Sequence, residues 1–249
     1  LELMTEQALL DSVVQGATSV GRPAPGKESD GSRKIIDRAM FDSDKILWVP
    51  VWGSITDVAQ ALHDAPEIAS RIRINYIGSS NTVNDPDARD YVYTFMEEQH
   101  PELWWIENGV LPKLSRDTFR GVYQTGKQNG EWGNIAFIEQ NIRGLGSDHD
   151  GLFDEVCGDA FPVAGWPKGS LKEGDSPTLL HLLSPVFGGV GNVDDPTAES
   201  WGGRYYRPEP DQFPNYYTDL DADANTCQET ISKWRLAYLR HWKERWVRY

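Results

Sequence analysis

A continuous apolar run, Ile46-Leu47-Trp48-Val49-Pro50-Val51-Trp52, most constrains the fold of this chain. Such a run is typical of a strand that is buried on both faces of a parallel sheet. A helix is predicted directly after it, over residues 56–63, and a second strand follows at residues 71–78. A helix over 87–99 and a third strand at 103–106 continue the alternation. This order predicts βαβ units with right-handed crossovers, so that ligands bind beyond the carboxyl ends of the strands.

The remaining segments are predicted as helices and loops of one domain that spans residues 1–249. Helices are predicted at residues 3–15, 32–40, 130–143 and 178–183, and one long helix is predicted at 219–248, where large apolar residues recur at steps of three and four. Loops are predicted at 16–32, 144–176 and 187–212, which are rich in glycine, proline or serine.

Composition excludes some partners and leaves the compartment open. The net charge of −14 disfavours nucleic acid polymers and acidic membrane surfaces. No apolar stretch reaches the roughly 18 residues of a membrane span, and residues 1–6 do not read as a signal peptide. Cys157 and Cys227 could pair in an exported protein or stay as buried thiols. Neither localisation nor oligomeric state can be inferred.

The chain is rich in aromatic residues, with ten Trp and ten Tyr. They can serve in core packing and on helix faces, or as flat platforms on which sugar rings or bases stack. Trp52, at the end of the first apolar strand, and Trp201, in a glycine-rich loop, are candidates for the second role.

Polar residues follow the predicted strands and suit a ligand with hydroxyl groups. Asn75, Ser79 and Asn81 lie at the end of the second strand, where amides and hydroxyls can bind a polyol. Asp175 follows a glycine just before a predicted helix, where its carboxylate could bind a hard cation or cap the helix.

Two groups of segments together resemble the nucleoside-hydrolase-like domain family, which includes inosine–uridine nucleoside hydrolases and a cellulose-binding protein. Residues 47–53 with 56–62 are similar to the family's strand–loop–helix unit. Glu173-Gly174-Asp175-Ser176-Pro177-Thr178 and Trp201-Gly202-Gly203-Arg204-Tyr205 are similar to its later signature. The resemblance implies a Rossmann-like α/β fold with a mostly parallel sheet flanked by helices. It also implies that the first strand and an Asp-rich turn precede Leu1.

The resemblance implies the roles of several residues around a Ca²⁺ ion. Asp175 corresponds to a late metal ligand, and the carbonyl of Val51, or of the adjacent Trp52, corresponds to a second one. Asn81, and less securely Asn75, corresponds to the asparagine that holds the ribose, and Trp52 or Trp201 could cover the sugar. Ser79 stands where nucleoside hydrolases have an acidic sugar ligand, and Gly174 stands where many have a histidine that protonates the leaving base. These two differences argue for a substrate other than an ordinary purine nucleoside.

Three functions are compatible with these residues. The first is Ca²⁺-assisted hydrolysis of a ribosyl or related N- or O-glycoside, with water activated by an aspartate upstream of this chain, which leaves the 249-residue chain itself inactive. The second is a carbohydrate-binding module that keeps the fold without the chemistry. The third is an unrelated α/β protein whose aromatic residues only pack. In the first two, the partner is a small-molecule nucleoside or carbohydrate.

Overall fold

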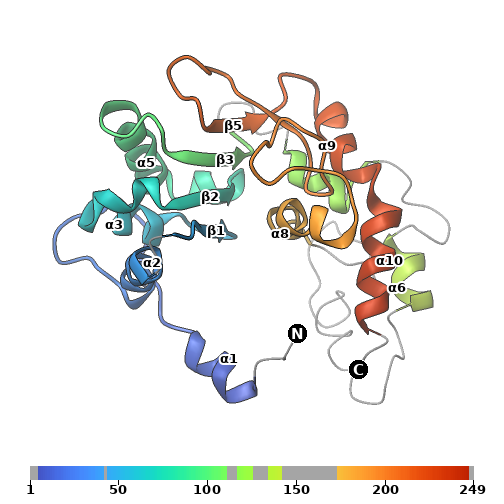
Figure 1. Cartoon of the computed structure of the whole chain (residues 1–249), viewed down its shortest axis with the longest axis horizontal. Coiled ribbons are helices and arrows are strands. Elements are labelled where there is room, and N and C mark those ends of the chain that lie inside the picture. The colour runs from blue at the N-terminus through green and yellow to red at the C-terminus, as the bar shows by residue number, and fades with distance from the viewer. Residues whose placement is uncertain (1–4, 42–43, 111–116, 126–133, 142–172, 247–249) are drawn as a thin grey trace. The chain divides into compact units, whose positions relative to one another are not determined.

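The protein is described here by a computed structural model that covers residues 5–41, 44–110, 117–125, 134–141 and 173–246. The chain forms two compact units (Figure 1). The first unit contains residues 1–106 and 207–216, and the second contains residues 107–206 and 217–249. Among the described residues, no helix has the length and apolar character needed to cross a bilayer.

Five strands form a mixed sheet in the order β1-β2-β3-β5-β4. The strands are β1 (Leu47–Val51), β2 (Ile72–Ile77), β3 (Trp104–Asn108), β4 (Tyr205–Tyr206) and β5 (Tyr216–Asp219). β1 and β2 are parallel, with Leu47 opposite Ile72 and Val51 opposite Tyr76, whereas β4 and β5 are antiparallel. The predicted α/β fold with a mostly parallel sheet flanked by helices is confirmed.

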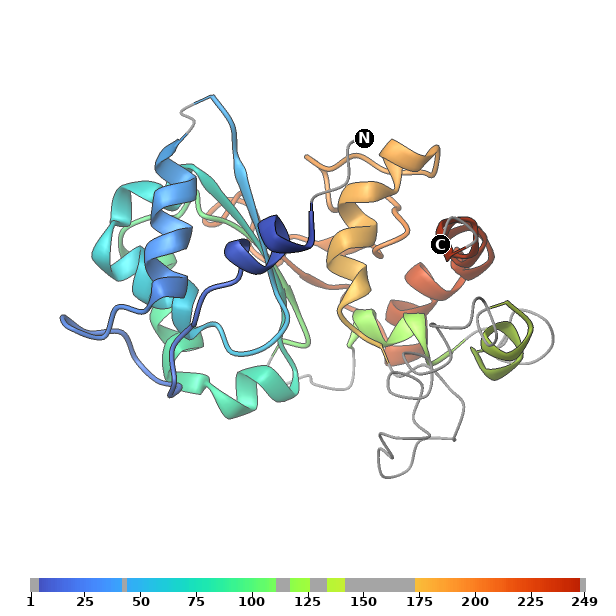
Figure 2. The same cartoon turned by 90° about the horizontal axis from the view of Figure 1, so that it is seen from below.

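The first unit follows the predicted strand–helix alternation. Its helices are α1 (Glu6–Ser12), α2 (Asp30–Phe41), α3 (Thr56–Asp64), α4 (Ser80–Asn84) and α5 (Pro86–Glu98), with a 3-10 turn, η1, at Pro66–Ser70. α2, α3 and α5 pack on one face of the strands (Figure 2), and the core there contains Leu62, Ile74, Tyr76, Val92 and Trp105. Because Ile74 and Tyr76 alternate along β2, Asn75 belongs to its opposite face.

The position of β1 differs from the prediction of a strand that is buried on both faces. β1 is the first strand of the sheet order, and four of its five residues are only half-buried. Pro50 suits such a position, because proline cannot donate a ladder hydrogen bond and is tolerated in edge strands. The apolar run therefore identified the strand correctly and overestimated its burial.

The second unit contains short helices and 3-10 turns, two of which fall on the helices predicted at residues 130–143 and 178–183. They are η2 (Thr118–Val122), α6 (Asn134–Asn141), α8 (Ser176–Leu183), η3 (Pro185–Phe187), α9 (Ala224–Ser232) and α10 (Arg235–Trp246). The single long helix predicted at 219–248 is wrong: Asp219 ends β5, and two helices follow. β4 also lies inside a predicted loop. α9 begins at an Asp223 cap that accepts from Thr226 N–H at 3.1 Å, which fixes a new helix start after β5.

Candidate functional site

The carboxyl end of β1 presents an aromatic surface. Val51 is the last residue of β1 and is buried, whereas 48% of the Trp52 surface that follows is exposed. Side chains alternate along a strand, so Trp48 and Pro50 share one face of β1. On that face the Arg73 guanidinium lies 5.1 Å from the ring of Trp48 and 5.2 Å from the ring of Trp104. This cluster lies nearer the amino ends of the strands, whereas Trp52 follows the carboxyl end of β1.

Asn75 lies on the same face as Arg73, and both polar atoms of its side chain are buried. It is opposite Pro50 in the β1–β2 register, and only 1% of its surface is exposed. Neither Nδ2 nor Oδ1 has a hydrogen-bond partner among the described residues. A buried amide without partners costs about 1–3 kcal/mol, so a ligand or water that both donates and accepts would stabilise it.

Ser79 and Asn81 follow β2 in a strained turn. Ser79 is buried and has φ +56°, a conformation that residues other than glycine rarely adopt and that often occurs at functional sites. Asn81 is half-buried, and its Nδ2 donates to the Ile77 carbonyl at 2.8 Å. One donor of Asn81 is therefore used by the turn itself, whereas the amide of Asn75 is not used in this way.

The starts of α3 and α5 are connected by a buried pair that the sequence analysis did not identify. The Thr56 hydroxyl donates to Asp85 Oδ2 at 2.6 Å, and Asp85 is fully buried. Asp85 Oδ1 has no partner among the described residues. An Asp-Pro pair after a strand could have suggested a helix start here, although not its partner Thr56, which is 29 residues away.

In the second unit, Asp175 precedes α8 without capping it. The Asp175 side chain makes no capping hydrogen bond, because Glu173 Oε1 accepts from both the Asp175 N–H, at 2.6 Å, and the Ser176 N–H. Desolvation raises the pKa of Glu173, an effect that these hydrogen bonds partly offset, and desolvation also raises the pKa of Asp175. Of the two roles that the sequence left open for Asp175, the capping role belongs to Glu173.

Trp201 lies in the core of the second unit, next to the glycines of its own motif. Only 5% of Trp201 is exposed, and it packs in a cluster with Ile231 and Tyr238. Gly202 lies against the start of α8, since a Cβ there would be 2.3 Å from the Pro177 carbonyl oxygen. The two signature motifs of the sequence therefore contact each other. The role of Trp201 in covering a sugar stays a prediction.

The predicted Ca²⁺ site stays a prediction. Among the described residues, no group of three or more His, Cys, Asp or Glu side chains is placed to hold a metal ion. The Asp175 carboxylate accepts no hydrogen bond from the described residues, which is compatible with the predicted role of a hard-cation ligand. The Val51 carbonyl stays a predicted ligand. Cys227 is buried, and Cys157 lies outside the described residues, so their pairing also stays open.

The mostly parallel sheet with its flanking helices is a nucleoside-hydrolase-like α/β fold. A similar fold occurs in a nucleoside hydrolase-related hypothetical protein from Saccharophagus degradans that is associated with carbohydrate metabolism, with a TM-score of 0.59 and 19% identity. The match covers 94% of this chain and 52% of that one, so the chain spans about half the length of the solved protein. Comparison with curated proteins gives no match.

The family described as cellulose-binding Sde182, nucleoside hydrolase-like domain, matches residues 2–205. This chain belongs to that family, and the predicted resemblance is confirmed.

Proposed function

We propose that this domain binds the glycosyl part of a carbohydrate or nucleoside at the carboxyl ends of β1 and β2. The observation that carries the proposal is the Asn75 side chain, which is buried with both amide atoms unpaired among the described residues. One sugar hydroxyl can accept from its Nδ2 and another can donate to its Oδ1. Neighbouring hydroxyls of a sugar supply both functions at the spacing of one amide group.

Trp52 gives the same edge a surface on which the apolar face of a sugar ring can stack. Its indole is half exposed directly after β1, and this edge is where ligands bind in parallel α/β sheets. The family description, cellulose-binding, and the association of the solved relative with carbohydrate metabolism support a carbohydrate as the ligand.

Replacing Asn75 with leucine separates ligand binding from structure. We expect the affinity for ribose or cellobiose, measured by calorimetry, to fall at least about tenfold, because two hydrogen bonds are lost. We also expect the free energy of unfolding to rise by about 1 kcal/mol, because an unpaired buried amide is replaced by an apolar group of similar size.

The matched control is Asn84→Leu, which changes an exposed asparagine of α4. It should leave the sugar affinity unchanged. A loss of stability in Asn75→Leu with unchanged sugar affinity would show that Asn75 is a structural residue and would contradict the proposal.

Hydrolysis of a glycosyl bond is the second candidate function. It is favoured by the Asp175 carboxylate, which does not cap α8 and can therefore bind a metal ion. A Ca²⁺ ion, when bound, would lower the pKa of water and orient sugar hydroxyls. Asp175 would hold the ion. The bond between the anomeric carbon and the leaving group would break as water oxygen bonds to that carbon. An aspartate outside these 249 residues would take the proton from water, so this reaction is proposed for a longer protein that contains the chain, which spans about half the length of the solved relative.

Asp175→Asn tests the metal role in that longer protein. We expect Ca²⁺ affinity, measured by calorimetry, to fall at least about tenfold, the scale typical of losing a group of the metal shell. Glu173→Gln is the matched control, because it weakens the cap of α8 and should lower the melting temperature while Ca²⁺ binding persists. Unchanged Ca²⁺ affinity in Asp175→Asn would remove the residue from the metal site.

A further inference from the structure

Residues 15–30, here named the strap, form an irregular segment that is fixed to α3 in the first unit. The Asp57 carboxylate accepts from the Ala17 N–H at 2.9 Å and from the Ser29 hydroxyl at 2.6 Å. The Gln60 side chain accepts from the Ala24 N–H at 3.2 Å and donates to the Ala24 carbonyl at 3.1 Å. The strap is therefore held at both ends and near its middle.

The two ends of the strap meet next to Asp57, where Gly16 and Gly31 lie. Gly31 N–H donates to the Gln15 carbonyl at 3.0 Å. A Cβ at Gly16 would be 2.4 Å from Asp57 Oδ2, and one at Gly31 would be 2.7 Å from the same atom. Side chains at these positions would push the strap away from α3, so the glycines allow a close approach that preforms the space beneath the strap.

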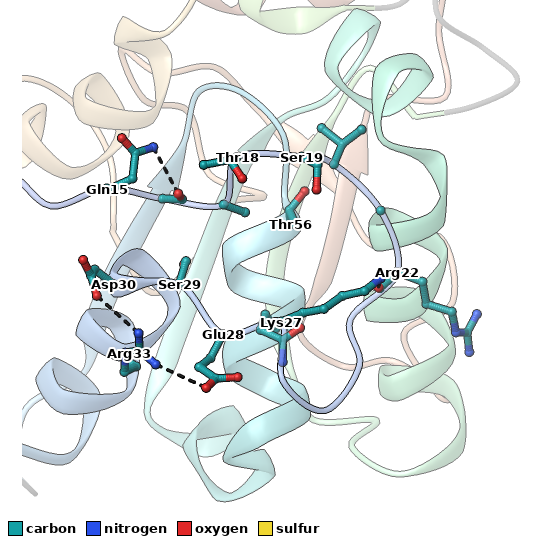
Figure 3. Close-up of a pocket in the computed structure, with 15 residues that line it drawn as sticks. Gln15, Thr18, Ser19, Arg22, Lys27, Glu28, Ser29, Asp30, Arg33 and Thr56 are labelled. Atoms are coloured by element: carbon teal, nitrogen blue, oxygen red, sulfur yellow. Dashed lines mark hydrogen bonds and ion pairs between the residues drawn. The ribbon is translucent and has the colours of Figure 1, made fainter.

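This space is a pocket of about 410 Å³ that is lined by the strap, the start of α2 and one side of α3 (Figure 3). Its volume falls in the range of small-molecule sites, roughly 300–1,000 Å³. Thr18 and Ser19 lie close to Thr56 at the amino end of α3. One end of the pocket therefore lies at the start of α3, after the loop that follows β1.

Three of the five charged residues that line the pocket form ion pairs with one another. Arg33 forms ion pairs with Glu28 at 3.4 Å and Asp30 at 3.3 Å, and Lys27 Nζ donates to the Arg22 carbonyl at 3.0 Å. The Arg22 guanidinium lies 5.5 Å from the Tyr91 ring and points away from Thr18 and Ser19 (Figure 3). The end of the pocket next to Thr18 and Ser19 therefore presents hydroxyl groups and not charges, and this end suits a neutral ligand.

The polar groups left for a ligand are hydroxyls and backbone amides. The Thr18 and Ser19 hydroxyls make no hydrogen bond within the described part of the protein, and neither do the N–H groups of residues 18–22. Hydroxyls donate and accept, whereas amides only donate. A neutral polyhydroxy compound matches this set, because each of its hydroxyls can do both.

We propose that the strap pocket binds one sugar unit, as a site separate from the Asn75 edge. It does not rest on the function proposed for that edge. A rigid, preformed pocket lowers the ordering cost of binding, and a single sugar in such a site should bind with a Kd on the order of 1 mM.

The test is a titration of ¹⁵N-labelled protein with D-glucose, followed by the amide resonances of residues 16–22. We expect these resonances to shift and saturate, and the double variant Thr18→Val, Ser19→Ala to bind about tenfold more weakly because two hydrogen-bonding groups are lost. Asn75→Leu should leave these shifts as they are in the parent protein. That control distinguishes failure at the Asn75 edge from failure in the strap pocket.

Sodium phosphate is the competing probe. Saturating shifts with phosphate and none with glucose would overturn the proposal in favour of an anion site. No shift at about 100 mM glucose, roughly a hundred times the expected Kd, would overturn it as well. Glucose shifts that survive unchanged in the double variant would place the sugar elsewhere and would likewise contradict the proposal.

Discussion

Thr56→Val is expected to lower the free energy of unfolding by about 3 kcal/mol. Valine has nearly the shape of threonine, so packing at the start of α3 is kept and only the hydroxyl is lost. The Asp85 carboxylate, fully buried and already without a partner at Oδ1 among the described residues, then loses the donor to Oδ2. Urea denaturation would measure the loss as a lower midpoint at an unchanged slope.

Thr56→Ser is the matched control, because serine keeps the donor. Its expected loss is below about 1 kcal/mol. Equal stability of the valine and serine variants would show that the Thr56–Asp85 bond contributes nothing, and the connection between α3 and α5 would then rest on apolar packing alone.

The Gly202→Ala variant is expected to lose about 3 kcal/mol as well, from a steric cause. A Cβ at Gly202 would lie 2.3 Å from the Pro177 carbonyl oxygen and 2.5 Å from the His181 backbone nitrogen. Both atoms belong to the backbone of α8 and cannot rotate away, so the helix or the loop must move. Thermal denaturation should show a clear fall in melting temperature.

Gly53→Ala provides the comparison, since no atom lies within 4 Å of a Cβ at Gly53. Its expected change is within about 0.5 kcal/mol. If Gly202→Ala were as mild, α8 would have to sit more loosely against this loop than the structure shows.

β1, β2 and β3 were predictable because each is a short segment rich in apolar residues, and because helices follow β1 and β2. Short β4 and β5 were not, since Tyr216-Tyr217-Thr218-Asp219 has no length or alternation to identify it. The pattern that suggested one C-terminal helix continues through Lys233 and Trp234, where α9 ends before α10 begins. A periodic pattern reports which face is apolar and does not report where the backbone breaks.

The candidate site was predictable in position and less so in detail. Asn75 and Asn81 were both chosen near the end of the same strand; Asn75 is buried inside β2 with both amide atoms unpaired among the described residues, whereas Asn81 follows β2 and donates to the Ile77 carbonyl. The sequence allowed Asp175 to cap α8 or to bind a cation. In the structure Glu173 accepts from the first N–H groups of the helix, so Asp175 does not cap it. Residues 16–32 were predicted as a loop, which is correct for most of them, although α2 already begins at Asp30. Their contacts with Asp57 and Gln60 depend on tertiary packing that a local pattern does not contain.

The Asp57 contacts also have a consequence for the order in which the first unit folds. Ala17 and Asp57 are 40 residues apart in the chain, and Ala24 and Gln60 are 36 apart. Closing loops of this length lowers the conformational entropy of the chain, and this cost precedes the stabilisation by the contacts. Each contact also needs a formed α3, whose own hydrogen bonds are local. We therefore expect the strap to dock after α3 has packed on the sheet, and to be among the first parts to detach when the unit opens locally.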